Sequence, residues 1–301
     1  MNEQEHIRGR GRFRFFPACW LFLGVTFGNV YLKGAPNFAI CPLQAEPVSV
    51  QEDTLAQDTT AVDTLNSEYV ATSVFRKLEN KAFEVGEHLV FDIAYKFVVA
   101  GTATMSIPDT QWVHGRPCYH VVTTATSSKF FDTFFKVRDR VETFIDMEGL
   151  FPWKFEKHIR EGKYRADRYV EYDQINNVAI HNQKDTLVVP PYVQGVLSSF
   201  YYVRTVPLEV GKSFDIDNYG DGKLYPLRVL VHRKMRVEVP AGVFDCIVVE
   251  PVLRSEGIFN QKGRLAIWLT DDERRIPVLM KSKVLVGSID VRLKAIEKRV
   301  Q

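Results

Sequence analysis

The sequence predicts a mainly β fold, and three observations predict it. Apolar and polar residues alternate in several stretches, which is the period of a half-buried strand. Aromatic residues make up 12% of the 301 residues, and flat rings pack well on a pleated sheet. Short clusters of glycine, proline and asparagine separate the alternating stretches, as expected of hairpin turns. With 46% hydrophobic and 25% charged residues, the composition is that of a globular protein with a sizeable core.

The first 45 residues are predicted to be a secretory signal peptide. Four arginines precede a mostly apolar stretch at residues 15–32, and small residues follow. We expect cleavage after Ala45, which would place the mature protein outside the cytoplasm, in the periplasm or associated with an outer membrane. The alternatives are a retained anchor helix, because 18 residues barely span a bilayer, and lipoprotein processing at Cys19 or Cys41.

Residues 46–73 are predicted to be a disordered acidic linker, because they hold six acidic residues, no basic ones and few large apolar ones. A single β domain is expected over residues 74–297. Residues 1–45 carry five basic and two acidic residues, so the remaining 34 basic and 35 acidic residues leave a net charge of −1. A nucleic-acid partner is not expected, because such proteins carry a basic surplus.

The first predicted strand has apolar residues at every second position, which places them on one face. These residues are Leu89, Phe91, Ile93, Tyr95 and Phe97. The other predicted strands are residues 137–145, 165–173, 228–239, 244–252, 265–269 and 289–296.

Two stretches break the alternation and are predicted to be short helices. Residues 129–136 hold Phe130, Phe131, Phe134 and Phe135, spaced for one or two helical turns. Apolar residues at helical spacing also follow Pro190 and Pro191.

The domain is predicted to contain an internal duplication, with halves at residues 83–190 and 208–297. Four turn residues of the first half recur 125 positions later in the second. The pairs are Gly86 and Gly211, Asp146 and Asp271, Pro152 and Pro277, and Gly162 and Gly287. Because neither half covers its own apolar face, the two sheets must pack together or close around something.

The motifs of common enzymes and metal proteins do not occur in this sequence. The seven histidines are scattered, and no nucleophile elbow, phosphate loop or dinucleotide fingerprint follows a predicted strand. We therefore predict no catalytic residue, no metal ligand and no cofactor. Cys118 and Cys246 remain after signal removal, and either a disulfide or two buried free thiols would suit an oxidising compartment.

Three passages carry a resemblance to a known family, namely residues 85–106, residues 136–163 and residues 239–293. Together they resemble the exported bacterial family called domain of unknown function 3108. The resemblance implies a signal peptide, a curved antiparallel β architecture of clam or half-barrel shape, and a place in the cell envelope. It implies no activity and no catalytic residue.

The leading hypothesis is a non-enzymatic envelope protein that binds an apolar or amphipathic, lipid-like ligand between the two β halves. The ligand-facing residues would be the five of the first strand together with Leu265, Ile267 and Leu269, and the four phenylalanines of residues 130–135 would form a lid. One alternative is an interaction or scaffold protein with a filled core and an envelope protein as partner. Another is a hydrolase of envelope glycan or lipid, which a buried cluster of titratable groups would favour. Membrane contact after signal removal is expected to be peripheral at most.

Overall fold

The computed structural model describes residues 75–95, 98–253, 265–283 and 288–298. The predicted signal peptide with Ala45, the linker residues up to 73, and Phe97 lie outside the described residues. The prediction of a mainly β fold with one or two short helices is confirmed. The strands are β1 (Glu87–Tyr95), β2 (Val98–Val113), β3 (Arg116–Ser127), β4 (Arg138–Asp146), β5 (Pro152–Glu161), β6 (Tyr164–Asp173), β7 (Val178–His181), β8 (Asp185–Val188), β9 (Gln194–Gly195), β10 (Ser213–Ile216), β11 (Asn218–Gly220), β12 (Lys223–Leu224), β13 (Leu227–Val239), β14 (Gly242–Leu253), β15 (Leu265–Thr270), β16 (Pro277–Lys283) and β17 (Ser288–Lys298).

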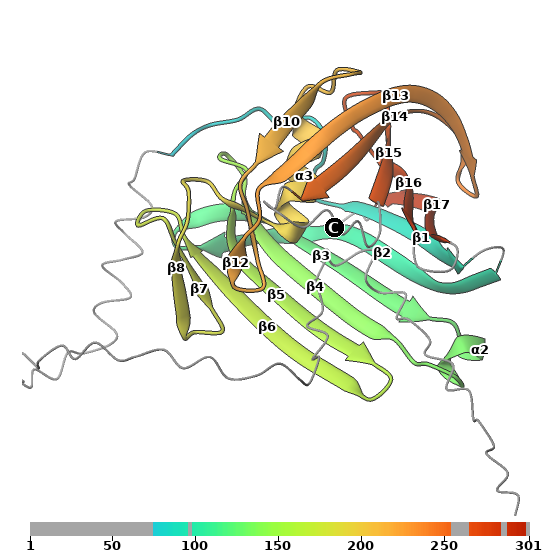
Figure 1. Ribbon diagram of the computed structural model, residues 1–301, viewed down its shortest axis with the longest axis horizontal. Coiled ribbons are helices and arrows are strands. Elements are labelled where there is room, and N and C mark those ends of the chain that lie inside the picture. The colour runs from blue at the N-terminus through green and yellow to red at the C-terminus, as the bar shows by residue number, and fades with distance from the viewer. Residues whose placement is uncertain (1–74, 96–97, 254–264, 284–287, 299–301) are drawn as a thin grey trace, which may run out of the picture.

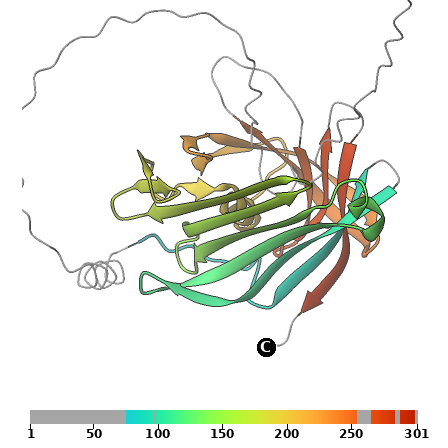
Figure 2. The same cartoon turned by 90° about the horizontal axis from the view of Figure 1, so that it is seen from below.

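Fourteen of the described strands form one curved, antiparallel sheet (Figure 1). Its order is β10-β13-β14-β15-β16-β17-β1-β2-β3-β4-β5-β6-β7-β8, and β9, β11 and β12 form a small second sheet. The last strand, β17, pairs with the first, β1, so the two ends of the described domain lie side by side (Figure 2). β10 and β8 are the two free edges, so the sheet is curved but not closed into a barrel.

Twelve of the fourteen strands form two six-stranded meanders, which we call the first meander (β1–β6) and the second meander (β10 and β13–β17), and β7 and β8 extend the first. Their β-bulges match, because the register of β2 shifts after Ser106 and that of β13 after Val231, 125 residues later. Gly86 precedes β1 and Gly211 precedes β10, the first strand of each meander, and both glycines have positive φ. Leu150 and Arg275 also have positive φ, and they precede the fifth strands, β5 and β16. Gly287 lies outside the described residues. On these correspondences we propose that the two meanders arose by duplication.

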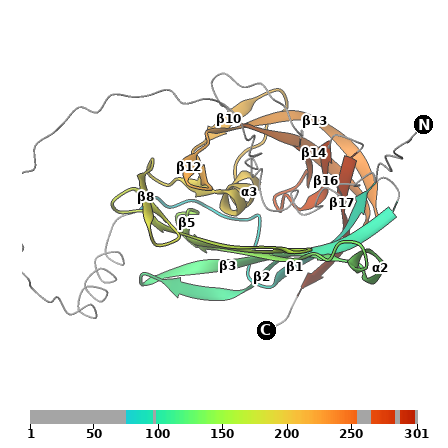
Figure 3. The same ribbon diagram turned by 60° about the horizontal axis from the view of Figure 1, so that its bottom comes forward.

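Helix α3 (Val196–Thr205) lies on the concave side of the sheet, between the part that carries β13 and β14 and the part that carries β3 and β5 (Figure 3). Its residues Leu197 and Tyr201 belong to the same buried apolar cluster as Phe91 of β1 and Leu269 of β15. The helix therefore joins the two meanders into one core. The other described helix, α2 (Lys129–Asp132), is a single turn between β3 and β4. None of the helices in the described chain is long and apolar enough to cross a membrane.

A fully buried ion pair fastens α3 to the sheet. The Arg204 guanidinium donates to both carboxylate oxygens of Glu87, each at 2.8 Å, and neither side chain has solvent exposure. Arg204 also donates to the carbonyl oxygens of Ala82, at 2.9 Å, and Arg274, at 3.2 Å. Its guanidinium lies 5.2 Å from the centre of the Tyr201 ring. Removing one partner of such a pair leaves an uncompensated buried charge, which is far more costly than removing both partners.

We predict that Arg204→Met lowers the free energy of unfolding by about 3–5 kcal/mol, because the buried Glu87 carboxylate loses both hydrogen bonds from Arg204 and keeps only the longer, 3.6 Å pair with the exposed Arg274. The double variant Glu87→Gln/Arg204→Met should recover part of that loss. Urea denaturation measures both. Arg236→Ala is the matched control, because its pair with Asp245 is exposed and should contribute less than about 1 kcal/mol. A loss at Arg204 as small as that of the control would contradict the prediction.

Candidate functional site

The structure brings the predicted ligand-facing residues of the two meanders together in one place. Leu89, Phe91 and Ile93 of β1 and Ile267 and Leu269 of β15 are all buried in one apolar cluster, and Leu265 packs against it. The same cluster contains Leu197 and Tyr201 of α3. These residues therefore form one continuous buried cluster with the helix, which is the arrangement expected of a filled core.

The four phenylalanines predicted as a lid divide into two kinds. Phe130 and Phe134 are exposed at 68% and 65% of their surface, and Phe131 is half-buried. The Phe135 ring packs against the core cluster and lies next to Gly162. The two exposed rings stack edge to face, with centroids 5.5 Å apart. Phe130 and Phe134 extend into solvent, so the four phenylalanines do not cover the concave side as a lid.

An exposed apolar surface lies around α2 at one end of the sheet (Figure 1). Val98 and Val99, at the start of β2, are exposed, and Ser128 donates a backbone hydrogen bond to the Ala100 carbonyl, which joins this segment to α2. We call the surface made by Val98, Val99, Phe130 and Phe134 the aromatic tip. The prediction that Tyr95 faces the concave side with Leu89, Phe91 and Ile93 is wrong, because the register shifts after Ile93 and Tyr95, which pairs with Val98, is exposed.

Basic side chains surround the aromatic tip. Lys129 and Lys136 flank the phenylalanines in the chain, and Lys163 and Arg165 lie on the adjoining β5–β6 hairpin. The Gly162 amide of that hairpin donates to the Lys136 carbonyl, at 2.7 Å, which places the hairpin beside α2. All four basic residues are exposed, and the described part of the chain offers none of them an ion-pair partner. Asp132, the acidic residue of α2, is paired with Arg138.

A pair of carboxyl groups is buried on the inner face of β4 and β5. Asp139 and Glu161 are 3% and 7% exposed, and Lys157 on the same face of β5 is also buried. One oxygen of Asp139 accepts the Arg160 amide at 2.6 Å. Burial, followed by the neighbouring Asp139 carboxyl, raises the pKa of Glu161 to about 7. Sequence reasoning missed this pair because its members are 22 residues apart and meet only through the register of the hairpin.

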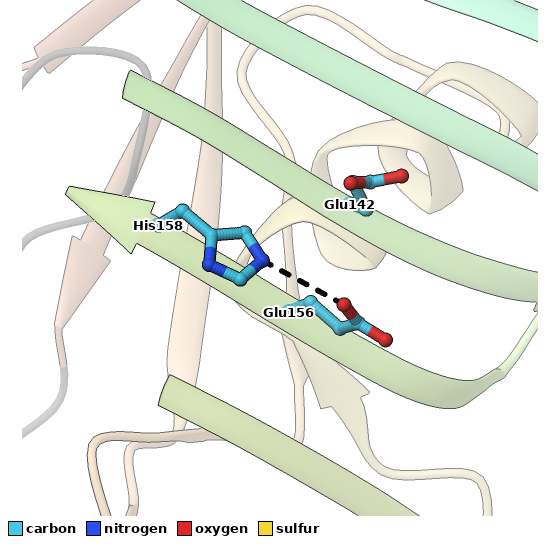
Figure 4. Close-up of side chains that lie close together, drawn as sticks. All are labelled: Glu142, Glu156 and His158. Carbon is cyan, nitrogen blue, oxygen red and sulfur yellow. Dashed lines mark ion pairs between the residues drawn. The ribbon is translucent and has the colours of Figure 1, made fainter. Parts of the chain in front are cut away.

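The outer face of β4–β6 holds a second polar group, formed by Glu142, Glu156 and His158 (Figure 4). All three side chains are half-buried. A hollow of about 140 Å³ adjoins Glu156 and is also lined by Lys154, Tyr169 and Glu171. The sequence offered no signal for this group, because its members come from two strands and only the cross-strand pairing brings them together.

Cys118 and Cys246 are both free and buried, so the structure has the second of the two predicted arrangements. They occupy corresponding places, because Cys118 pairs with the last residue of β4 and Cys246 with the last residue of β15. Burial raises the pKa of each thiol to about 12, so neither is an activated nucleophile.

Comparison with solved structures shows the fold. A β-barrel-like protein of domain of unknown function DUF1849 from Brucella abortus aligns with a TM-score of 0.50 and 11% identity, over 73% of this chain and all of that one. Two other structures align with TM-scores below 0.5, and we base no conclusion on them. One is described as a candidate exported protein with a YmcC-like fold from Bacteroides fragilis (TM-score 0.27, 11% identity, 75% of this chain and all of that one). The other is described as a candidate lipoprotein from Parabacteroides distasonis (TM-score 0.29, 8% identity, 75% of this chain and all of that one).

A comparison with curated proteins gave no match. The model of one protein family, described as a protein of unknown function (DUF3108), matches residues 90–294. The match covers both meanders, from within β1 to within β17. Because it extends over more than half of the sequence, this chain belongs to the DUF3108 family, as its resemblance to that family predicts.

Proposed function

We propose that this protein is a non-enzymatic, exported protein of the cell envelope that binds an anionic lipid surface through its aromatic tip. The observation that carries the proposal is the exposure of Phe130 and Phe134 at the end of a well-packed domain. Large rings that are exposed side by side on a soluble domain are typical of a binding surface. The basic N-terminal segment and the apolar stretch after it support export.

The chemistry of the aromatic tip suits the boundary between lipid headgroups and acyl chains. Burying each phenylalanine ring would contribute about 1.5–3 kcal/mol. Each lysine or arginine close to an anionic surface adds about 1 kcal/mol, and four exposed basic residues surround the tip. The contact is peripheral, since only side chains of the tip would enter the bilayer.

A ligand held between the two meanders, our leading hypothesis from the sequence, is less well supported than a lipid surface at the tip. Such a ligand would have to displace α3, which shares one buried apolar cluster with Phe91 and Leu269 and carries Arg204 of the buried ion pair with Glu87. The filled core favours a protein that acts through its surface. A filled core is also compatible with an envelope protein as partner, and such a partner would bind to the same exposed rings.

The buried carboxyl pair is the one observation that favours the hydrolase alternative. Two adjacent carboxyls that share a proton are a recurring acid–base device, and the raised pKa of Glu161 fits such a role. Glu161 and Asp139 are nearly inaccessible, however, and they share the inner face of β4 and β5 with the core residues Val141 and Ile159. We therefore assign the pair a structural role, which makes the stability of the protein dependent on pH.

We predict that Phe130→Glu/Phe134→Glu weakens binding to vesicles containing phosphatidylglycerol at least tenfold, because it removes the apolar contact and adds two like charges. Co-sedimentation measures the binding. Trp112→Glu is the matched control, since Trp112 is 71% exposed at the opposite end of β2 and should not affect binding. Wild-type protein should bind neutral phosphatidylcholine vesicles much more weakly. Equal binding by the double variant and the wild type would overturn the proposal.

A second prediction concerns pH. The folded pKa of Glu161, about 7, lies above the ordinary value of 4.5, so the folded state favours the protonated carboxyl. This group's contribution to stability is therefore complete below pH 4.5 and is lost as the pH rises to about 7. Glu161→Gln should make the free energy of unfolding less dependent on pH between 4.5 and 7, and should stabilise the protein at pH 8 relative to wild type. Parallel pH profiles of the two proteins would show that Glu161 does not titrate in this way.

A further inference from the structure

Two carboxylates face each other on the outer side of the first meander. Glu142 of β4 and Glu156 of β5 are directly opposite in the strand register, on the same face of the sheet. Like charges in directly opposed positions destabilise a sheet unless a cation lies between them. His158, two residues after Glu156 on that face, directs its ring towards the same place (Figure 4).

The His158 ring is oriented as a metal-binding histidine would be. Its Nδ1 lies 2.7 Å from an Asp167 carboxylate oxygen, which also accepts a hydrogen bond from Arg160. An ionised carboxylate only accepts hydrogen bonds, so Nδ1 carries the proton and donates it to Asp167. In the neutral ring the lone pair is then on Nε2, which faces Glu156. A histidine whose second nitrogen donates to a carboxylate is the usual outer-shell arrangement of protein metal sites.

The distances between the ligand atoms of these side chains fit the binding of one shared ion better than a direct hydrogen bond between His158 and Glu156. His158 Nε2 lies 3.7 Å from Glu156 Oε2, which is too long for a hydrogen bond. Two ligand atoms about 2.1 Å from a tetrahedral zinc ion lie about 3.4 Å apart. The ligand atoms of Glu142, Glu156 and His158 all lie within 4.8 Å of one another, so a shift of about 1 Å would bring Glu142 into the coordination shell as well.

Glu142 is held ionised and in position before any ion binds. Arg140 donates to both of its oxygens, and His120 Nε2 lies 2.6 Å from one of them. Burial raises the pKa of Glu142, but the hydrogen bonds from Arg140 and His120 outweigh it and hold that pKa below its ordinary value. Metal ligands must be deprotonated to bind. Arg140 would also compete with a metal ion for Glu142, because its positive charge partly neutralises the Glu142 carboxylate when no metal is bound.

We propose that Glu142, Glu156 and His158 form a binding site for a divalent cation of the zinc type. Imidazole nitrogen and carboxylate oxygen are both zinc ligands, and three protein ligands leave one position open. The hollow lined by Lys154, Tyr169 and Glu171 adjoins Glu156, so a water molecule or a small anion would have room beside the bound ion. The site lies on the outer face of the sheet, so it is independent of the aromatic tip and of the filled core.

The test is a titration of the full chain, purified without a histidine tag, with Zn²⁺ against a chromophoric chelator. We expect one equivalent to bind, with affinity reduced at least tenfold by His158→Ala and by Glu156→Gln. Co²⁺ in place of Zn²⁺ should give the visible absorption of a four-coordinate site, and this absorption should disappear in both variants.

His232→Ala is the matched control. His232 Nε2 forms a 2.8 Å pair with Glu250 in the second meander, and among the described residues this pair belongs to no three-membered ligand group. The control should bind Zn²⁺ as the wild type does. The variants alter surface positions, so unchanged thermal unfolding without metal confirms that they are folded. Two results would overturn the proposal: an absence of stoichiometric binding to the wild type, or equal binding by the wild type and the His158 and Glu156 variants.

Discussion

The buried pair of Arg204 and Glu87 is the interaction on which the rest of this structure depends. A curved, open sheet of fourteen described strands has an apolar concave face that must be covered. Helix α3 covers it, and the ion pair fixes the helix in one position, because Arg204 has hydrogen-bond partners on β1, before β1 and before β16. Packing alone would let an apolar helix slide, whereas a buried charge that needs these partners at fixed positions does not. The pair therefore defines how the two meanders meet.

Because α3 is fixed on the concave side, we expect the protein to recognise other molecules through its outer surface. With α3 packed on the concave side, two surface features of the described residues stand out for recognition, the aromatic tip and the polar outer face. They are chemically different, since the tip has exposed rings and unpaired basic residues, whereas the outer face has opposed carboxylates and histidines. Both belong to the first meander. If the meanders are duplicates, both of the binding surfaces that we propose lie in the first, while the second contributes to the shared core.

Much of the fold could be predicted from the sequence, because seven strands have large apolar residues at every second position. β2 and β3 were missed because small buried residues such as Ala103 and Ala125 alternate along the strand with threonines of the opposite face, which gives little contrast in hydrophobicity. The site was harder to predict. The four phenylalanines near α2 were expected to be covered, yet Phe130 and Phe134 are exposed, because a single helical turn can direct only some of its rings inward. The groups around Glu161 and His158 depend on cross-strand register, which a single sequence does not specify.

We propose that α3 is a permanent part of the core and that lipid binds outside this core. Hydrogen–deuterium exchange, measured with and without anionic vesicles, tests both parts at once. We expect that the amides of α3 stay protected in both conditions and that vesicles slow exchange only at the aromatic tip, around residues 98–99 and 128–136, and at the adjoining β5–β6 hairpin. Loss of protection in α3 when vesicles are added would contradict it, because the helix would then be leaving the concave side to admit a ligand.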